Sequence, residues 1–200
     1  MELARMTVAC AVATLAVGAT GCSSGSKPAA TSATSSSASA APSSTSPGTS
    51  GQPTDYSYLL IKASDIGGDL TAPQPPVVNP NGAVGVAQLF ANSDSSRRIR
   101  DTILIVADPA VAAAGLDNTK ANYAGKVSGN WQPVDVGANG ALISGSSPDN
   151  SQAITVLLFT EGKALVNLEF GSVPSDPIDA DIAKDIGRKQ DAAIKKGLPS

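Results

Sequence analysis

Residues 23–54 are the segment that most limits how this chain can fold. The segment consists mostly of Ser, Thr, Ala and Pro, carries one charged residue, Lys27, and has no apolar side chain larger than Ala. Such a composition cannot bury enough apolar surface to offset the entropy lost on folding. The sequence therefore predicts a disordered tether, either a plain spacer or a glycosylated stalk, within residues 22–54, and confines the folded domain to residues 55–200.

A short apolar segment precedes the tether. Residues 7–21 are mostly small and apolar, follow a start that contains Arg5, and run directly into Cys22. About fifteen residues are too few to cross a membrane, which takes roughly 20, but they have the length and flanks of a secretory signal peptide. We therefore expect residues 1–21 to be a signal peptide, with translation starting at Met1 or Met6.

The residues around Cys22 resemble the lipobox of bacterial lipoproteins. Residues 19–22 read Ala-Thr-Gly-Cys, which is a run of small residues before a cysteine. The resemblance implies cleavage before Cys22, acylation of Cys22 with chains such as palmitate, and a cell-membrane lipoprotein on the extracytoplasmic face. Two or three acyl chains hold a protein on a membrane durably. The alternative is an ordinary signal peptide with a free Cys22, although a lone thiol is unusual in an exported protein.

Composition excludes several functions for the folded domain. The chain has no His, and its only cysteines are Cys10 and Cys22, so residues 55–200 lack the usual general base, nucleophilic thiol and soft metal ligands. The 14 Lys and Arg are outnumbered by 17 Asp and Glu, which leaves little positive charge for binding nucleic acid. We expect a non-catalytic domain with no cofactor, no metal and no nucleic-acid partner.

Apolar, β-branched runs predict an antiparallel sheet in the domain. Polar or glycine-containing turns lie between them at residues 92–98, 139–140 and 161–163. The alternation within 164–170 is typical of an edge or half-exposed strand. The expected strands are 84–91, 99–107, 134–136, 141–144, 153–160 and 164–170.

Two helices are expected beside the sheet. Asp108 and Pro109 have the pattern of an N-cap and first helical residue, and Asp176 and Pro177 repeat it near the C-terminus. The buried stripe of the second helix would be Ile178, Ile182, Ile186 and Ala193. The element order predicts an α+β fold, with an antiparallel sheet of about five to six strands and helices packed on it.

The two strands at 99–107 and 153–160 are apolar on both faces, so both faces of the sheet must be covered. Either helices cover both faces, in an α/β/α sandwich, or one face lines a ligand cavity; the sandwich is the simpler interpretation. A groove would be lined by Leu104, Val106, Trp131, Leu157, Phe159 and Leu165. Trp131 would rim it or, more simply, plug an edge of the core.

Charged and hydroxyl side chains give weaker hypotheses. Arg97, Arg98 and Arg100 would contact an anionic headgroup, a wall polymer or an acidic protein patch, or simply form a solvated turn. A hydrolase would need Ser144 beside a Lys or a carboxylate. A cation site would use four carboxylates of the closing helix, which more simply complement its dipole. These are Asp176, Asp179, Asp181 and Asp185.

The chain as a whole resembles the cell-envelope lipoproteins of mycobacteria and related actinobacteria. The strand pair at 154–170, with Phe-Thr-Glu-Gly-Lys at its turn and a closing helix after it, is similar to PsbP/Mog1-like lipoproteins. Residues 59–67 resemble the sensor domains of mycobacterial receptor kinases. The resemblance implies a lipid-anchored module that binds an envelope lipid, a glycolipid or a protein. A protein adaptor with no small ligand is the alternative, and an envelope hydrolase is a third.

Overall fold

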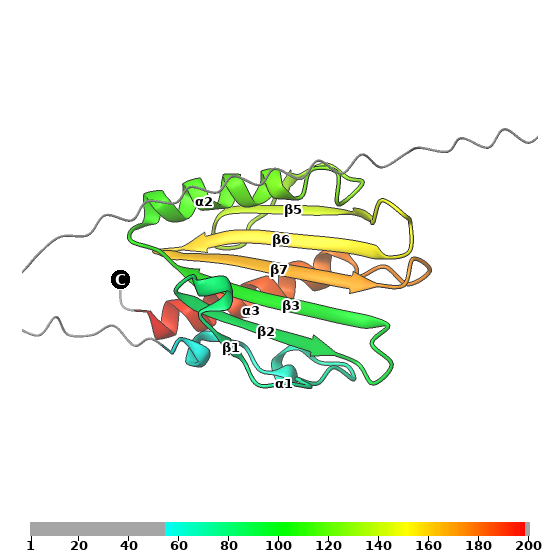
Figure 1. The fold of residues 1–200 in the computed structure, drawn as a ribbon, viewed down its shortest axis with the longest axis horizontal. Coiled ribbons are helices and arrows are strands. Elements are labelled where there is room, and N and C mark those ends of the chain that lie inside the picture. Colours follow the sequence, from blue (N-terminus) through cyan, green and yellow to red (C-terminus); the bar gives the residue numbers. More distant parts are fainter. Residues whose placement is uncertain (1–54, 199–200) are drawn as a thin grey trace, which may run out of the picture. The chain divides into compact units, whose positions relative to one another are not determined.

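The computed structural model describes residues 55–198, so the expected signal peptide, Cys22 and tether lie outside the described residues. A seven-stranded antiparallel sheet, in the order β1-β2-β3-β7-β6-β5-β4, runs through these residues (Figure 1). Its strands are β1 (Val77–Val78), β2 (Gly85–Ala91), β3 (Arg97–Ile105), β4 (Gln132–Pro133), β5 (Ala138–Ser146), β6 (Ala153–Glu161) and β7 (Ala164–Ser172). The α+β class is confirmed. The strand number exceeds the expected five to six because two-residue strands flank both edges.

Three helices pack on the sheet. They are α1 (Ala63–Ile66), α2 (Pro109–Asn122) and α3 (Ala180–Gly197), with short 3-10 turns η1 (Ser57–Leu59) and η2 (Pro80–Gly82) beside them. Helix α3 contacts β6 and β7 from one side, and α2 contacts the same two strands from the other. We call these sides the α3 face and the α2 face.

The chain uses hairpins for neighbouring strands and one helical crossing. The β2–β3 and β6–β7 pairs are joined by short turns, as expected from their polar and glycine-containing loops. Helix α2 then carries the chain from β3, near one edge, to β4 at the opposite edge. Asp108 caps this helix by accepting a hydrogen bond from the Val111 amide at 2.9 Å, and Pro109 follows it, as expected.

The α3 face holds most of the core. Alternate residues of β3, β6 and β7 point into it, and the first described residues join it from η1. Gln190 of α3 holds that segment in place: its amide nitrogen donates to the Leu59 carbonyl at 2.7 Å, and its oxygen accepts from the Ile61 amide at 3.1 Å. Because these bonds are buried, they fix the entry of the chain into the domain without leaving its backbone unpaired.

Helix α3 begins later than the sequence indicates. Asp179, not Asp176, is the N-cap, and its carboxylate accepts from the Asp181 amide at 2.7 Å. Asp176 instead forms an ion pair with Arg97 at the start of β3. The expected buried stripe is also partly wrong, since Ile182 is 54% exposed, and Ala183, Ile186, Gln190 and Ile194 form the buried side.

The Asn139-Gly140 pair is not a hairpin turn. Both residues lie within β5, where the register with β6 shifts between Ala138 and Ala141, and Asn139 has a φ of 56°. The link from β4 to β5 falls earlier, after Pro133. A side chain at position 140 would meet the Val134 carbonyl at 2.5 Å, so this glycine allows the connecting loop to approach the strand.

Strand β7 is central rather than an edge strand, and the expected half-exposed face is confirmed, because Asn167 and Glu169 are partly buried. It pairs with β3 on one side and β6 on the other. Its polar residues Asn167 and Glu169 resembled an exposed face, but Tyr123 from the end of α2 reaches them. The polar alternation therefore reflects a partner on a helix, which strand periodicity alone does not reveal.

Candidate binding site

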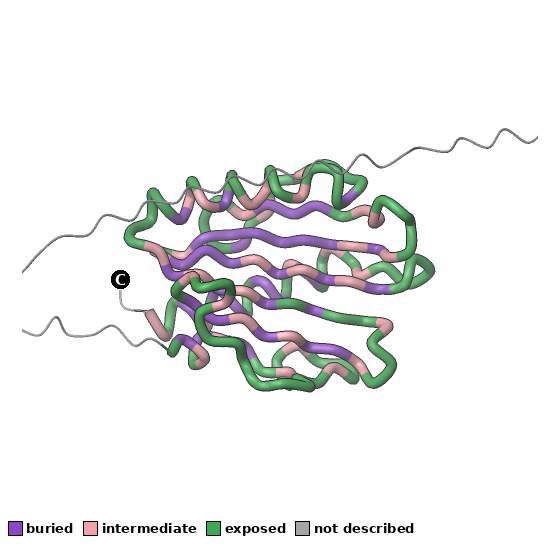
Figure 2. Tube along the Cα trace, in the orientation of Figure 1, coloured by how far each residue is buried: buried purple, intermediate pink, exposed green. Residues whose placement is uncertain are grey.

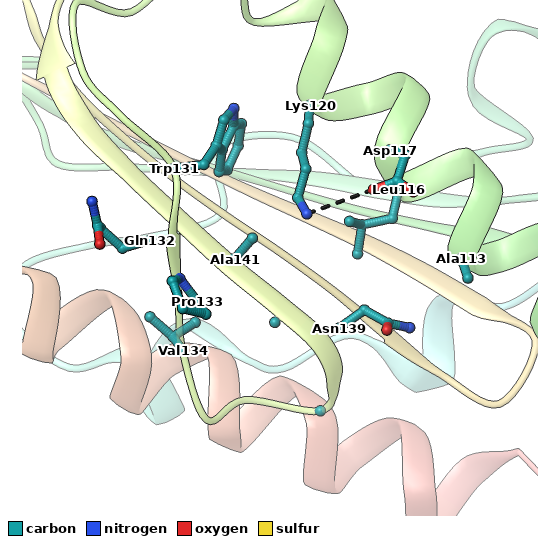
Figure 3. A pocket seen from close by; sticks show the side chains of 12 residues that line it. Ala113, Leu116, Asp117, Lys120, Trp131, Gln132, Pro133, Val134, Asn139 and Ala141 are labelled. Carbon is teal, nitrogen blue, oxygen red and sulfur yellow. Dashed lines mark ion pairs between the residues drawn. The ribbon is translucent and has the colours of Figure 1, made fainter.

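An open groove lies between α2 and the chain that enters β5. It has a volume of about 540 Å³ and is bounded by Ala113, Leu116, Asp117 and Lys120 of α2 on one side. Trp131, β4 and the first residues of β5 form the other side (Figure 3). We call it the α2 groove.

Trp131 is the largest side chain of the α2 groove and is only partly buried. Its ring packs edge-on against Tyr123, with centroids 6.1 Å apart and an interplanar angle of 72°. A second hollow of about 410 Å³, lined by Tyr123, Val127 and Ile143, shares Trp131 and Lys120 with the groove. Trp131 therefore borders two concave surfaces, both of which are lined in part by α2.

The groove is lined by both polar and apolar side chains. Lys120 lies between Trp131 and Leu116 in Figure 3, and its ammonium is 3.6 Å from the Asp117 carboxylate. Asn139 is fixed by donating to the Thr160 hydroxyl at 3.1 Å. The α2 groove thus combines a rigid aromatic ring with one cation, one carboxylate and side-chain amides.

A partly buried polar network supports the helix beside the groove. The Tyr123 hydroxyl donates to Glu169 Oε2 at 2.8 Å and accepts from Asn167 Nδ2 at 3.0 Å. Burial raises the pKa of Tyr123 well above its usual range, so its hydroxyl remains a donor. This network fixes the end of α2, and with it the position of Trp131.

The structure does not bring the six expected groove residues together. Leu104, Trp131 and Leu165 belong to the cluster under α2, whereas Leu157 and Phe159 are fully buried under α3. Val106 lies just beyond β3, where its amide donates to the Lys163 carbonyl. The separation follows from register: Leu104 pairs with Leu165, and Leu157 pairs with Leu168, which points to the α3 face.

The three arginines also divide between the two faces. Arg97 is on the α3 face and pairs with Asp176. Arg98 and Arg100 are exposed on the α2 face, where Arg98 Nη2 is 2.8 Å from Gln152 Oε1 and Arg100 stands opposite Glu169. A small hollow of about 140 Å³ lies between these side chains.

The carboxylates of the closing helix are dispersed. Asp176 pairs with Arg97, Asp179 caps α3, and Asp181 and Asp185 pair with Lys184 and Arg188. Across residues 55–198, no group of three His, Cys, Asp or Glu side chains is placed to hold a metal ion.

Ser144, the serine that a hydrolase would use, lies beside a hydroxyl group rather than beside a Lys or a carboxylate. Ser144 Oγ lies 3.0 Å from Thr155 Oγ1, and Thr155 in turn donates to the Ile178 carbonyl at 3.3 Å. Neither neighbouring group is a base that would remove the serine proton.

Sequence reasoning found Trp131 but missed Asp117, Lys120, Gln132 and Asn139. These residues come from a helix, a short edge strand and a strand bulge, and only the folded chain brings them to one place. Their types are common on protein surfaces, so no local pattern would have singled them out.

Comparison with known proteins gives no match to a family model, to a curated protein or to a solved structure. Among residues 55–198, no helix has the length and apolar character needed to cross a membrane.

Proposed function

We propose that this chain is a lipid-anchored, non-catalytic lipoprotein of the cell envelope that binds the carbohydrate headgroup of a glycolipid in the α2 groove. The observation that carries the proposal is the α2 groove itself, with Trp131 beside Lys120, Asp117 and the fixed amide of Asn139. A sugar ring has an apolar C–H face and a rim of hydroxyls. An aromatic ring packs on the first, while amides and charged groups hydrogen-bond the second.

The open shape of the groove fits a headgroup better than an acyl chain. An acyl chain needs an enclosed apolar cavity, whereas this hollow is open and its lining includes the exposed residues Asp117, Gln132 and Pro133. Arg98 and Arg100, on the same face, would contact an anionic group if the glycolipid carries one.

We also infer the finer architecture, an α/β/α sandwich in the layout of PsbP/Mog1-like lipoproteins. The packing of α2 and α3 on opposite sides of β6 and β7 supports the sandwich. The resemblance of residues 154–170 supports the layout.

Trp131 makes the proposal directly measurable because it is the only tryptophan of the chain. The mature form, residues 22–200 with Cys22→Ser, retains every described contact and is titrated with soluble mono- and disaccharides while its fluorescence is followed. Binding is expected to shift or quench the emission. Lys120→Ala should weaken the affinity about fivefold, because a charge-assisted hydrogen bond is lost.

Tyr58→Ala is the matched control, since it removes a half-exposed aromatic ring that lies outside the α2 groove. It should leave the titration unchanged. If no saccharide changes the Trp131 emission, or if Lys120→Ala and Tyr58→Ala behave alike, the carbohydrate proposal is wrong.

The anchor is tested separately in cells. Full-length protein should partition with membranes, and the Cys22→Ser form should move to the soluble or secreted fraction. Full retention of the Cys22→Ser form on membranes would refute acylation as the anchor.

One observation favours a second function, a protein adaptor. Val77 and Val78 of β1 and the nearby Val84 are 56%, 41% and 51% exposed at one edge of the sheet. Exposed apolar residues that gather at a sheet edge are typical of protein contacts. Chemical cross-linking in cells with Val77→Lys as the comparison tests this function, which requires a cross-linked partner that the variant loses.

A further inference from the structure

Another pocket, distinct from the three hollows described above, lies on the α3 face, at the end of the domain where α3 begins. Its volume is about 330 Å³. Residues of α1 and the loop after it form one wall, β3 forms the floor, and the first turns of α3 form the other wall. We call it the Arg97 pocket. It is separated from the α2 groove by the sheet, so it does not depend on the function proposed above.

Isoleucines and one leucine form the inner surface of this pocket. The side chains come from three segments that are distant in sequence: Ile66, Leu70, Ile99, Ile178, Ile182 and Ile186. Ile182 is 54% exposed although it lies on a helix whose other outward residues are mostly polar. A large apolar side chain that borders a hollow is positioned to contact an apolar ligand, and burying it would be favourable.

The rim of the pocket carries more negative than positive charge. Asp69, Asp176 and Asp179 stand there against a single cation, Arg97. Arg97 donates a hydrogen bond from Nε to Asp176 Oδ2 at 3.0 Å. This bond and the charge of Asp176 raise the pKa of Arg97, and the negative charge of Asp69 adds a smaller effect in the same direction. Asp179 is engaged in capping α3. Asp69 is therefore the carboxylate left to neutralise a charge brought by a ligand.

The loop that carries Asp69 leaves the entrance open. Gly67 and Gly68 precede it with φ values of 83° and 71°, and no atom lies within 4 Å of the position that a Cβ would take at either residue. Positive φ explains the glycines there. Both glycines line the pocket and are exposed, so the loop carries no side chain at these two positions that would narrow it.

We propose that the Arg97 pocket binds a small amphiphile with an apolar body and a protonated amine. The apolar body contacts Ile66, Ile178 and Ile182, and the ammonium lies beside Asp69. Charge complementarity selects the amine over a carboxylate of the same length, because a carboxylate would have to displace Asp176 from Arg97 and approach Asp69 and Asp179.

Octylammonium and octanoate are the matched probes, since they share an alkyl chain and differ in the sign of the charge. Each is titrated below its micelle concentration into residues 22–200 carrying Cys22→Ser, and backbone amide NMR signals are followed. Octylammonium should shift the signals of Gly67 and Gly68 and of the first turns of α3, and octanoate should not. Equal binding of both probes, binding of octanoate alone, or no binding would each overturn the proposal.

Three variants test the charge argument in opposite directions. Asp69→Asn should weaken octylammonium binding about threefold, in keeping with an exposed ion pair. Arg97→Gln should strengthen it, because Asp176 is released to face the ligand. Asp185→Asn, which removes an equal charge from the outer side of α3, should change nothing. If Arg97→Gln weakens binding or Asp185→Asn matches Asp69→Asn, the site is not the one proposed.

Discussion

The two faces of the sheet have the same strands but different surroundings. On the α3 face, every long strand contributes side chains to one large buried cluster, which includes residues of α3 and η1 and has α1 packed against it. On the α2 face, the buried cluster is small and lies under one helix, while Leu89 of β2 and the β3 residues on this face are half-exposed or exposed (Figure 2). The α3 face therefore supplies most of the stability, and the α2 face leaves more of the sheet surface uncovered.

The difference originates in the helices. Helix α3 places Ala183, Ile186 and Ile194 on one side, whereas α2 is rich in alanine and buries only Ala112 and Leu116. A helix with so little apolar surface can cover only a few strands. The open part of the α2 face and the α2 groove follow from this sparse packing.

The largest expected effect concerns Asp101, which lies in the middle of the well-covered face. Its side chain is 0% exposed, and among the described residues neither of its carboxyl oxygens has a hydrogen-bond partner. Burial raises the pKa of Asp101 to about 8 from an ordinary value of 3.8. The folded protein therefore keeps this proton up to about pH 8, while the unfolded chain releases it above about pH 4.

This difference in proton binding determines the sign of the pH effect. Between about pH 4 and pH 8 the unfolded state binds fewer protons, so the free energy of unfolding falls as the pH rises, by about 1.4 kcal/mol per pH unit from this group. Asp101→Asn removes that slope and should be more stable than the unaltered protein at pH 7 by on the order of 4 kcal/mol. Urea unfolding at pH 5 and pH 7 measures the difference in unfolding free energy between the two forms. If that difference does not grow with pH, Asp101 is ionised or solvated in the folded protein.

The next comparison is one leucine from each face. Leu157→Ala, on the α3 face, should cost about 3 kcal/mol of unfolding free energy, because it leaves a cavity in a fully buried site. Leu89→Ala, on the open part of the α2 face, should cost about 1 kcal/mol, since Leu89 is already partly in contact with water. Equilibrium unfolding in urea gives both values, and equal costs would contradict the difference between the faces.

The parts of the fold that the sequence predicts are those determined by residues close together in the chain. The β6–β7 hairpin and the start of α2 were predictable, because alternation, a Gly162 turn with a φ of 53° and an Asp-Pro cap are all encoded within a few residues. The face to which Leu157 points relative to Leu104 was not predictable, because it depends on register across β7. A shift of one residue would exchange the faces.

The site was predictable only in part for the same reason. Trp131 was identifiable as a rare aromatic residue, but its neighbours Lys120 and Asn139 come from separate elements. Asp176 was a plausible cap by sequence, yet Arg97, 79 residues away, competes for it. Local pattern identifies candidates, and long-range pairing decides between them.

Glycines in the two helices extend the comparison to close packing. An added Cβ at Gly187 of α3 would lie 2.3 Å from Leu157 Cδ2 and 3.0 Å from Val136 Cγ1, so Gly187→Ala should destabilise the protein by about 1–3 kcal/mol. At Gly115 of α2 the nearest atom is Leu165 Cδ2 at 3.1 Å. There the gain in helix propensity, about 1 kcal/mol, offsets a small adjustment, so Gly115→Ala should be close to neutral. Thermal unfolding compares the stabilities of the two variants. If Gly115→Ala destabilises the protein as much as Gly187→Ala, then α2 packs as tightly as α3.

The smallest expected effect concerns the polar network beneath α2. Tyr123→Phe removes the hydroxyl that joins α2 to Asn167 and Glu169, and it should cost about 0.5–1.5 kcal/mol. The cost is limited because Asn167 and Glu169 are only partly buried and reach water once the tyrosine hydroxyl is gone. The same substitution should broaden the Trp131 emission, because the ring of Trp131 packs against a helix end that is no longer fixed. Urea unfolding and Trp131 fluorescence measure the two effects separately. A loss of unfolding free energy above about 3 kcal/mol would place this network in a dry core like that under α3. An unchanged emission would show that the α2 groove keeps its structure without the network.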